Sequence, residues 1–286
     1  MTGRIVLFAI SILLVLVSLP TRVYSQSFSP GQSTRCLALP ADVSADISPT
    51  REQLAHAWGK DSIEFAEDLQ YLSIDASELP MLGFKQQLIP NEKGSTRSQV
   101  KWSLAPTKIY QLTQKVFFSP NFDWGGRYEG GKIGFGLAGG SAPTGGQIAD
   151  DGFTARFKWR GNHDGTARLV VYSYASDRTQ NLPYGDDYRL TDVIIPTGEW
   201  FEITLQVEMN SSPSQSDGAV RAWFNGIPAL SLNGIRWQSE GADAVIDSII
   251  YASFYGGGNS LWSPENETYI RFADVCLTTP APKQRI

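Results

Sequence analysis

The sequence predicts an all-β fold: an antiparallel two-sheet β-sandwich (jelly roll) with a short helical N-terminal extension. Residues 201–209 alternate apolar and polar side chains, which is typical of a strand buried on one face. Asn225-Gly226 directly follows a short apolar run and is a strong hairpin-turn signal. From about residue 101, such short runs are separated by Gly, Pro, Asn and Asp without a helical period between them. This spacing favours a sandwich or jelly roll.

Residues 1–25 have the organisation of a secretory signal peptide. Arg4 precedes an apolar run from Ile5 to Leu19, and the small-residue site Val23-Tyr24-Ser25 follows Pro20. The run is shorter than the ~20 residues of a membrane span, which favours cleavage after Ser25 over an uncleaved anchor. We therefore expect a secreted, extracellular protein that has no membrane segment after cleavage.

Residues 26–99 read as an N-terminal extension with short helices. A lead-in rich in Ser, Pro and Asp ends at Ser48-Pro49, which resembles an N-cap with proline at the first helical position. The pattern predicts one helix over about residues 50–58 and a second over Ser62 to Leu72, the latter from its apolar stripe. Residues 80–100 have the composition of a loop.

Residues 100–278 read as a single jelly-roll domain, and residues 279–286 as a C-terminal tail. Alternating runs predict strands over residues 153–160 and 201–209, a third at Val220 to Phe224 before the hairpin turn, and a last strand over Tyr269 to Leu277. No internal repeat is visible, so one domain accounts for this stretch.

The interpretation of the cysteines and of the sequons depends on secretion. Cys36 and Cys276 lie near opposite ends of the chain, and an oxidising compartment favours a disulfide between them over two buried thiols. In a eukaryotic host, Asn210 and Asn266 would be glycosylation sites, because each begins an Asn-x-Ser/Thr sequon.

The net charge of −5 excludes a uniformly basic nucleic-acid-binding protein. The two cysteines and two scattered histidines give no zinc-ligand spacing, so we expect neither a metal nor a cofactor. An anionic ligand would need a local basic patch. We expect the protein to be a monomer.

One stretch concentrates chemistry-bearing side chains. Lys132 follows two glycines in an expected loop, and the pairs Thr154/Arg156 and Tyr172/Tyr174 are each spaced i, i+2 within a predicted strand. Side chains two apart in a strand share a face, so each pair points one way. If the strands are adjacent, cations, hydroxyls and phenols converge on a surface without a carboxylate, which suits the handling of an acidic sugar.

In a uronic-acid chain, carbon 5 carries a proton that the adjacent carboxylate makes weakly acidic. Removing it while the 4-linked oxygen departs cleaves the chain by β-elimination. Arg156 and Lys132 would neutralise the carboxylate. Tyr172 or Tyr174 would serve as base and acid if the neighbouring cations lower a phenol pKa from ~10. A desolvated Lys132 is the alternative base.

Three further residues are weaker candidates for substrate binding. Lys158 shares the strand face of Arg156 and would extend a basic track, although an exposed strand lysine is the simpler interpretation. Arg221 and Trp223 share a face before the hairpin and would form either a sugar platform or ordinary sheet packing.

The order of motifs resembles polysaccharide lyase family 14 over roughly residues 100–278. The matching segments are Phe122-Asp123-Trp124, Gly130-Gly131-Lys132, Gly152-Phe153-Thr154-Ala155-Arg156, Trp159-Arg160, Tyr172-Ser173-Tyr174, Gly198-Glu199-Trp200, Asn225-Gly226 and Phe254-Tyr255-Gly256-Gly257. That family contains alginate and glucuronate lyases on a β-jelly-roll fold. The resemblance implies a cleft lined by Lys132, by Thr154 with Arg156, and by Tyr172 with Tyr174.

The chain departs from the family pattern at three places. Thr154 stands where serine is usual, which keeps the hydroxyl and adds a methyl group. Residues 133–136 replace the usual Leu-Pro-Gly, and the connection from Arg156 to Tyr172 is longer than usual. These departures leave the preferred uronic acid (mannuronate, guluronate or glucuronate) open, as well as endo or exo action.

Two other functions remain alternatives to a secreted lyase acting on an anionic polysaccharide. A non-catalytic carbohydrate-binding jelly roll would use the same face to hold but not cut its ligand. A retaining glycoside hydrolase would need carboxylates at i, i+2 on one strand, and the segments Glu202-Ile203-Thr204 and Asp186-Asp187-Tyr188 do not supply that pattern.

Overall fold

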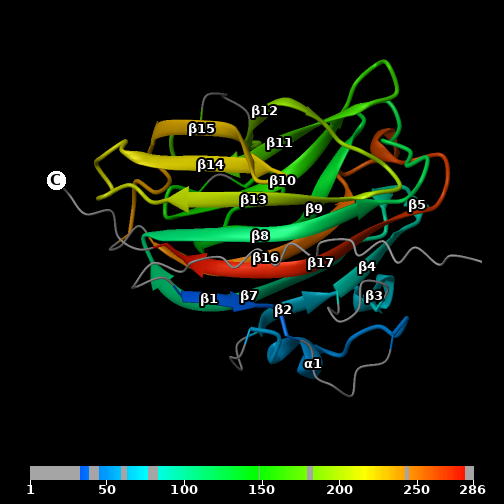
Figure 1. The fold of residues 1–286 in the computed structure, drawn as a ribbon. Coiled ribbons are helices and arrows are strands. Elements are labelled where there is room, and N and C mark those ends of the chain that lie inside the picture. The colour runs from blue at the N-terminus through cyan, green and yellow to red at the C-terminus, as the bar shows by residue number, and fades with distance from the viewer. Residues whose placement is uncertain are drawn as a thin grey trace, which may run out of the picture.

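The alternating strands build two antiparallel sheets that pack face to face, as the sequence predicts (Figure 1). The computed structural model describes residues 33–38, 45–58, 63–76, 83–147, 149–178, 183–241 and 245–280. The expected signal peptide, residues 1–25, lies outside this range. No helix among the described residues has the length and apolar character needed to cross a bilayer.

Sheet A, which lies in front in Figure 1, follows the order β15-β14-β13-β8-β17-β4-β3, and β1 also pairs with β17. Its strands are β15 (Ile227–Ile235), β14 (Gly218–Phe224), β13 (Trp200–Glu208), β8 (Ile109–Phe118), β17 (Thr268–Thr279), β4 (Gly83–Leu88), β3 (Leu72–Asp75) and β1 (Ser33–Cys36).

Sheet B lies behind it and follows the order β12-β11-β10-β9-β16-β7-β2. Its strands are β12 (Asp186–Ile194), β11 (Ala167–Tyr174), β10 (Gly152–Gly161), β9 (Gly130–Gly140), β16 (Ile246–Tyr255), β7 (Ser98–Thr107) and β2 (Ile63–Glu67). The short strands β5 (Pro90–Asn91) and β6 (Gly94–Ser95) form a separate small hairpin.

Aromatic and aliphatic side chains from both sheets fill the space between them. Sheet A contributes Phe118 and Phe272, and sheet B contributes Phe135 and Phe157, all without exposed surface. The rings of Phe135 and Phe272 meet edge to face across the layers, with centroids 6.4 Å apart. The period-two pattern is therefore explained by burial against the opposite sheet.

The predicted strands and hairpin turn are confirmed. On β13, the apolar side chains from Phe201 to Val207 point into the core. Asn225 and Gly226 join β14 to β15 with φ angles of 49° and 76°, and this left-handed pair is what a type I′ hairpin turn requires.

The expectation for the first helix is partly right. Helix α1 (Arg51–Ala55) is shorter than predicted, and its N-cap is Thr50 rather than Ser48. Thr50 and Gln53 form a reciprocal capping box, which outweighs the local signal from Pro49.

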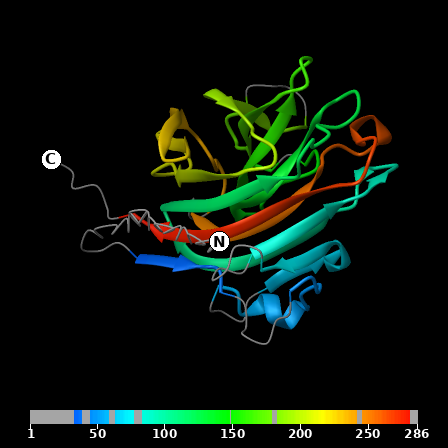
Figure 2. The ribbon, with the colours of Figure 1, turned by 45° about the vertical axis from the view of Figure 1, so that its right-hand side comes forward.

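The second predicted helix, Ser62 to Leu72, is wrong. Ile63–Glu67 is strand β2, and Leu69–Tyr71 is a single 3₁₀ turn, η1. β2 pairs with β7, and this pairing brings some of the apolar side chains of the expected helical stripe, Ile63, Ala66 and Leu69, into partly buried contact with the core. The expected loop over 80–100 is also wrong where Gly83–Leu88 forms β4. Figure 2 shows these segments continuing the two layers beside α1.

The predicted disulfide between Cys36 and Cys276 is present. The two residues lie directly opposite each other on β1 and β17, so the cross-link joins the first described strand to the last.

Candidate active site

The register of β10 and β11 brings two predicted pairs together. Arg156 on β10 lies opposite Tyr172 on β11, and Thr154 lies opposite Tyr174. Directly opposite residues of antiparallel strands point to the same side of a sheet. All four therefore point to the face of sheet B that is turned away from sheet A.

Lys132 joins this face from the neighbouring strand. It lies within β9, opposite Lys158 on β10, so the expectation that it sits in a loop is wrong. The expectation that Lys158 is an exposed strand lysine is wrong too, because the side chains of both lysines are buried. A strand position fixes the ammonium of Lys132 more tightly than a loop would.

The shared face is hollowed into a groove of about 1020 Å³. Its charged lining residues are Arg97, Lys132, Arg156, Lys158, Arg160, Asp186 and Asp187. Its aromatic lining residues are Tyr128, Tyr172, Tyr174, Tyr184, Phe254 and Trp262. Basic side chains outnumber acidic ones, so the groove favours an anionic ligand within an acidic protein.

A bulge in β9 makes room for Arg156. The pairing with β10 shifts so that Gly136 faces Arg156 while Ile133 faces Phe157. The backbone adopts a left-handed conformation at Gly134, with φ of 56°. A Cβ atom on Gly136 would lie 2.5 Å from Cγ of Arg156, so glycine leaves the space that the arginine side chain uses.

The two tyrosine hydroxyls form a short hydrogen-bonded chain. Tyr172 donates its hydroxyl hydrogen to Oη of Tyr174 at 3.3 Å. The backbone amides of Gly185 and Gly146 donate to Oη of Tyr172 and Tyr174, at 2.9 Å and 3.1 Å respectively. Each phenol oxygen thus has a fixed orientation and faces positive backbone dipoles.

The pKa of Tyr172 moves in the opposite direction to the one expected. Burial, together with the hydrogen bond and charge of Tyr174, raises it well above the ordinary phenol value, and the amide of Gly185 and the charge of Arg156 lower it by less. Tyr172 is therefore protonated at neutral pH and is suited to donate a proton rather than to accept one.

Lys132, in contrast to Tyr172, is suited to accept a proton. Its ammonium lies 3.4 Å from the ring centroid of Tyr172. Burial lowers its pKa well below the ordinary lysine value, and the positive charges of Lys158, Arg156 and Arg160 lower it further. The side chain of Lys132 is thus desolvated, which is the condition for it to act as the base.

Lys158 lies between two aromatic rings. Its Nζ is 4.8 Å from the ring centroid of Tyr172 and 4.9 Å from that of Trp262. Burial and the neighbouring cation Arg160 lower its pKa to about 7. Arg160 is itself paired with Asp187 at 2.7 Å, so that carboxylate is already engaged.

Arg156 is a buried cation with an unused donor. Its Nε atom has no hydrogen-bond partner among the described residues, although the side chain is only 3% exposed. A buried donor of this kind is costly unless a ligand satisfies it. A carboxylate in the groove would be such a ligand, since a guanidinium binds it with paired hydrogen bonds.

Thr154 does not line the groove, contrary to the expectation that it binds substrate. Its side chain is fully buried, and its hydroxyl donates to the carbonyl oxygen of Pro143 at 3.0 Å. This bond holds the segment that leads to Gly146, whose amide contacts Tyr174. Thr154 therefore positions the segment that contacts Tyr174.

Arg221 and Trp223 lie outside the groove. Both are on β14 of sheet A, whose neighbouring residues Val220 and Ala222 point into the core, so they face away from sheet B. Arg221 is bound to Glu208 at 3.2 Å and to Gln206. The expected sugar platform does not belong to this site.

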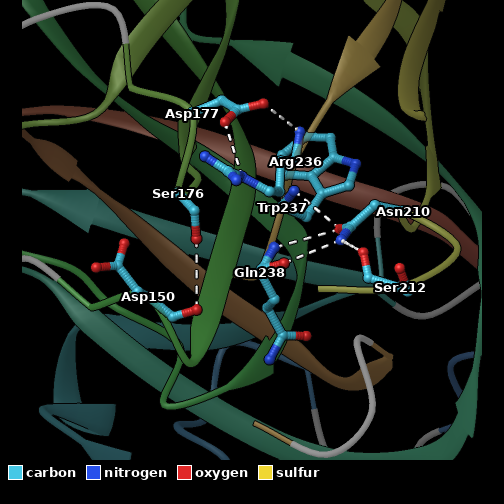
Figure 3. Close-up of polar contacts among 8 residues, drawn as sticks. All are labelled: Asp150, Ser176, Asp177, Asn210, Ser212, Arg236, Trp237 and Gln238. Carbon is cyan, nitrogen blue, oxygen red and sulfur yellow. Dashed lines mark hydrogen bonds and ion pairs between the residues drawn. The ribbon is translucent and has the colours of Figure 1, made fainter. Parts of the chain in front are cut away.

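Asn210 is a structural residue rather than a glycosylation site (Figure 3). It is fully buried, and its Nδ2 donates to the carbonyl oxygens of Ser212 at 2.6 Å and Gln238 at 2.9 Å. Its Oδ1 accepts from the amides of Trp237 and Gln238. The prediction for Asn210 is therefore wrong, whereas Asn266 is exposed and remains a candidate.

The same network secures the ends of the strands that carry the site (Figure 3). Asp177, just after β11, bonds through its carboxylate to both the amide and Nε of Arg236. Ser176 donates its hydroxyl to the carbonyl oxygen of Asp150, just before β10. Gln238, after β15, donates from Nε2 to the carbonyl oxygen of Asp151 at 2.6 Å, so the segment after β15 links the start of β10 to the end of β11.

Sequence reasoning missed several groove residues. Arg97 lies directly before β7, and Trp262 belongs to the 3₁₀ turn η2 (Ser260–Trp262). Phe254 of β16 lies in a segment that resembles the family, but no role in the groove was expected of it. The one local signal was the triple glycine at 256–258. A Cβ on Gly257 would lie 1.8 Å from Nε1 of Trp262, so glycine there permits the close packing of the indole.

Two further expectations concern acidic side chains. Glu202 lies on β13 in sheet A, outside the groove, and Asp187 within the groove is paired with Arg160. Within the described ranges, no group of three or more His, Cys, Asp or Glu side chains is arranged to hold a metal ion. The expectation of metal-independent activity remains a prediction.

Solved structures share this fold over most of the chain. The alginate lyase Aly36B superposes with a TM-score of 0.70 at 23% identity, covering 87% of this chain and 96% of that one. The marine PL-14 alginate lyase from Aplysia kurodai gives 0.65 at 18% identity, covering 83% and 98%. The endo-β-1,4-glucuronan lyase from the fungus Trichoderma reesei gives 0.50 at 12%, covering 76% and 91%.

At these identities the structures establish the common fold alone. No curated protein matches the chain. The family model Polysaccharide lyase 14 matches residues 87–275, which is more than half of the sequence and includes all the groove-facing residues of β9, β10 and β11. The chain therefore belongs to polysaccharide lyase family 14.

Proposed function

We propose that this polysaccharide lyase cleaves a uronic-acid polymer by β-elimination at carbon 5. The observation that carries the proposal is the set of three buried basic side chains, Lys132, Arg156 and Lys158, on one groove face. Buried like charges are costly in the free protein and are relieved by a bound anion. The similar folds named as alginate and glucuronan lyases support a carboxylate-bearing sugar as that anion.

Arg156 is suited to bind the carboxylate of the sugar that loses its proton. Its free Nε donor and fixed charge would stabilise the enolate-like state that develops as the C5–H bond breaks. Lys158 would add charge nearby once the substrate raises the pKa of that lysine above its free-protein value of about 7.

Lys132 is suited to be the base, and the tyrosine pair to be the acid. The neutral amine of Lys132 accepts the C5 proton, and the C5 electron pair forms a double bond to C4. The C4–O bond breaks, and the departing oxygen takes a proton from the Tyr172–Tyr174 hydroxyl chain. The reaction consumes no water and leaves an unsaturated uronate.

Absorbance near the ultraviolet edge tests this function, because each cut creates a conjugated unsaturated uronate. Polymers of mannuronate, guluronate and glucuronate would be screened together. Rising absorbance on at least one polymer is expected, and the rate should increase towards alkaline pH as Lys132 loses its proton. Binding without any absorbance change would favour the carbohydrate-binding alternative.

The role of Lys132 is tested by Lys132→Arg beside Lys132→Met. Arginine keeps the charge but does not lose its proton, so a catalytic base predicts a loss of about 10²–10⁴-fold in kcat for both variants. If Lys132→Arg keeps most of the wild-type kcat, Lys132 is a charge anchor and the base lies elsewhere.

Secretion is part of the proposal. It rests on the signal-like residues 1–25 and on the cross-link between Cys36 and Cys276, which is typical of oxidising compartments. Expression in the native host should release protein whose N-terminus begins at Gln26. Material retained in the cell with residues 1–25 intact would contradict it.

A further inference from the structure

A row of side chains on the groove face crosses three neighbouring strands and ends at the residue that precedes a fourth. Lys158 on β10 lies opposite Lys132 on β9, which in turn lies opposite Phe254 on β16. Ser253 of β16 pairs with Ser98 of β7, so Arg97 continues the register next to Phe254. The row therefore ends on a third basic side chain, which is two strands away from Lys132.

Arg97 is held in place at that end of the groove. Its guanidinium carbon lies 4.5 Å from the ring centroid of Phe254, and one of its amino groups donates to the carbonyl oxygen of Lys93 at 3.3 Å. The stacked guanidinium faces the same groove as Lys132 and Lys158. A planar cation presented in this way is suited to a carboxylate.

The spacing of the row matches a polysaccharide that runs across the strands. Neighbouring strands lie about 4.8 Å apart, so Arg97 and Lys132 are separated by roughly 10 Å at the backbone. A 1,4-linked pyranose advances a chain by about one strand spacing. A sugar over Lys132 therefore has its neighbour level with strand β16 and the next sugar level with Arg97.

We propose that Arg97 binds the carboxylate of the sugar two positions from the one over Lys132, and so selects chains that carry a uronate there. The inference rests on the proposed function and deepens it. Phe254 lies between Lys132 and Arg97 in the row and would contact the intervening sugar, so the row offers no charged group to the carboxylate of that sugar.

The experiment compares Arg97→Gln with Lys85→Gln. Lys85 is a matched control because its ammonium also lies over an aromatic ring, that of Tyr269 at 4.7 Å, but on β4 in the other sheet. Cleavage and binding are measured on uronate oligosaccharides of increasing length and on the same polymer after partial carboxyl reduction.

Arg97→Gln should lower kcat/KM and affinity about tenfold on long chains, the worth of one charge-assisted hydrogen bond, and leave the shortest cleaved oligosaccharide unaffected. Arg97→Lys should restore part of the loss. Carboxyl reduction of the polymer should lower kcat/KM and affinity more for the wild-type protein than for Arg97→Gln. Lys85→Gln should have wild-type kcat/KM and affinity on every substrate.

An equal effect of Arg97→Gln at every length, or no effect at any length, would overturn the inference. Because binding is measured beside cleavage, a wild-type protein that binds uronate chains without cutting them would refute the elimination mechanism. The length dependence of binding would still decide the role of Arg97.

Discussion

The buried side chain of Lys158 carries a stability cost that a bound anion would relieve. Its pKa falls from 10.5 to about 7 on folding, so the unfolded chain binds more protons between these values. Stability therefore rises with pH across this window, and the penalty for burying the charge is fully present below pH 7. Relief of that penalty by an anion is part of what would drive binding.

Lys158→Met should consequently raise the melting temperature of the free protein at pH 6. The gain should shrink as the pH rises from about 7 towards 10.5 and vanish above it, because the lysine is then neutral in both states. Calorimetric scans at several pH values measure it. A destabilised variant at pH 6, or a gain independent of pH, would contradict the assigned burial cost.

Tyr174→Phe isolates one hydroxyl. It removes the oxygen that accepts hydrogen bonds from Gly146 and Tyr172 while leaving the ring. Elimination should slow by about 10²–10⁴-fold, with little change in thermal unfolding. Tyr188→Phe on β12 is the control, since Tyr188 lies opposite the core residue Val171 and faces away from the groove. Equal rates for both variants would remove Tyr174 from the mechanism.

At the scale of single elements, the bulge in β9 determines where Arg156 lies. Gly136→Ala places a Cβ 2.5 Å from Cγ of Arg156 and 2.6 Å from the carbonyl oxygen of Ala155. Either the arginine or the strand must move, so we expect at least a tenfold loss of activity and a lower melting temperature. Wild-type values for both would show that the strands pair without this close approach.

Strands of the sandwich were predictable because a strand buried on one face alternates apolar and polar residues, as β13 does from Phe201 to Val207. Strand β2 was not, because its partly exposed edge position leaves Ile63 and Ala66 spaced as on a helix. Its strand conformation comes from pairing with β7, a contact that lies far away in the sequence.

The site was predictable where residues spaced i, i+2 on a strand must point to the same face of the sheet, as for Arg156, Tyr172 and Tyr174. The direction of the Tyr172 pKa was not, because it depends on burial by the segments that bring Gly146 and Gly185 over the site. Arg97 had no local signal either, since only the register of β7 against β16 brings it into the groove.

For the whole molecule, the disulfide closes a long loop. Cys36 and Cys276 are 240 residues apart, so the cross-link restricts most of the unfolded chain. Cys36→Ser should lower the free energy of unfolding by about 2–5 kcal/mol while the folded protein keeps its activity, because the groove lies in the other sheet. Reductant should destabilise the wild type to the same level and leave the variant unchanged. A wild-type protein whose free energy of unfolding does not change with reductant would contradict this prediction.

Strand β1 also has a consequence for solubility. Strand β4 pairs with β17 only from Thr268 to Phe272, and β1 pairs with the remaining part from Cys276 to Thr279. Without β1, the backbone groups there would form an open edge that a second molecule can extend. A chain starting after Leu37 should therefore self-associate in light scattering, whereas Cys36→Ser, which keeps the strand, should stay monodisperse.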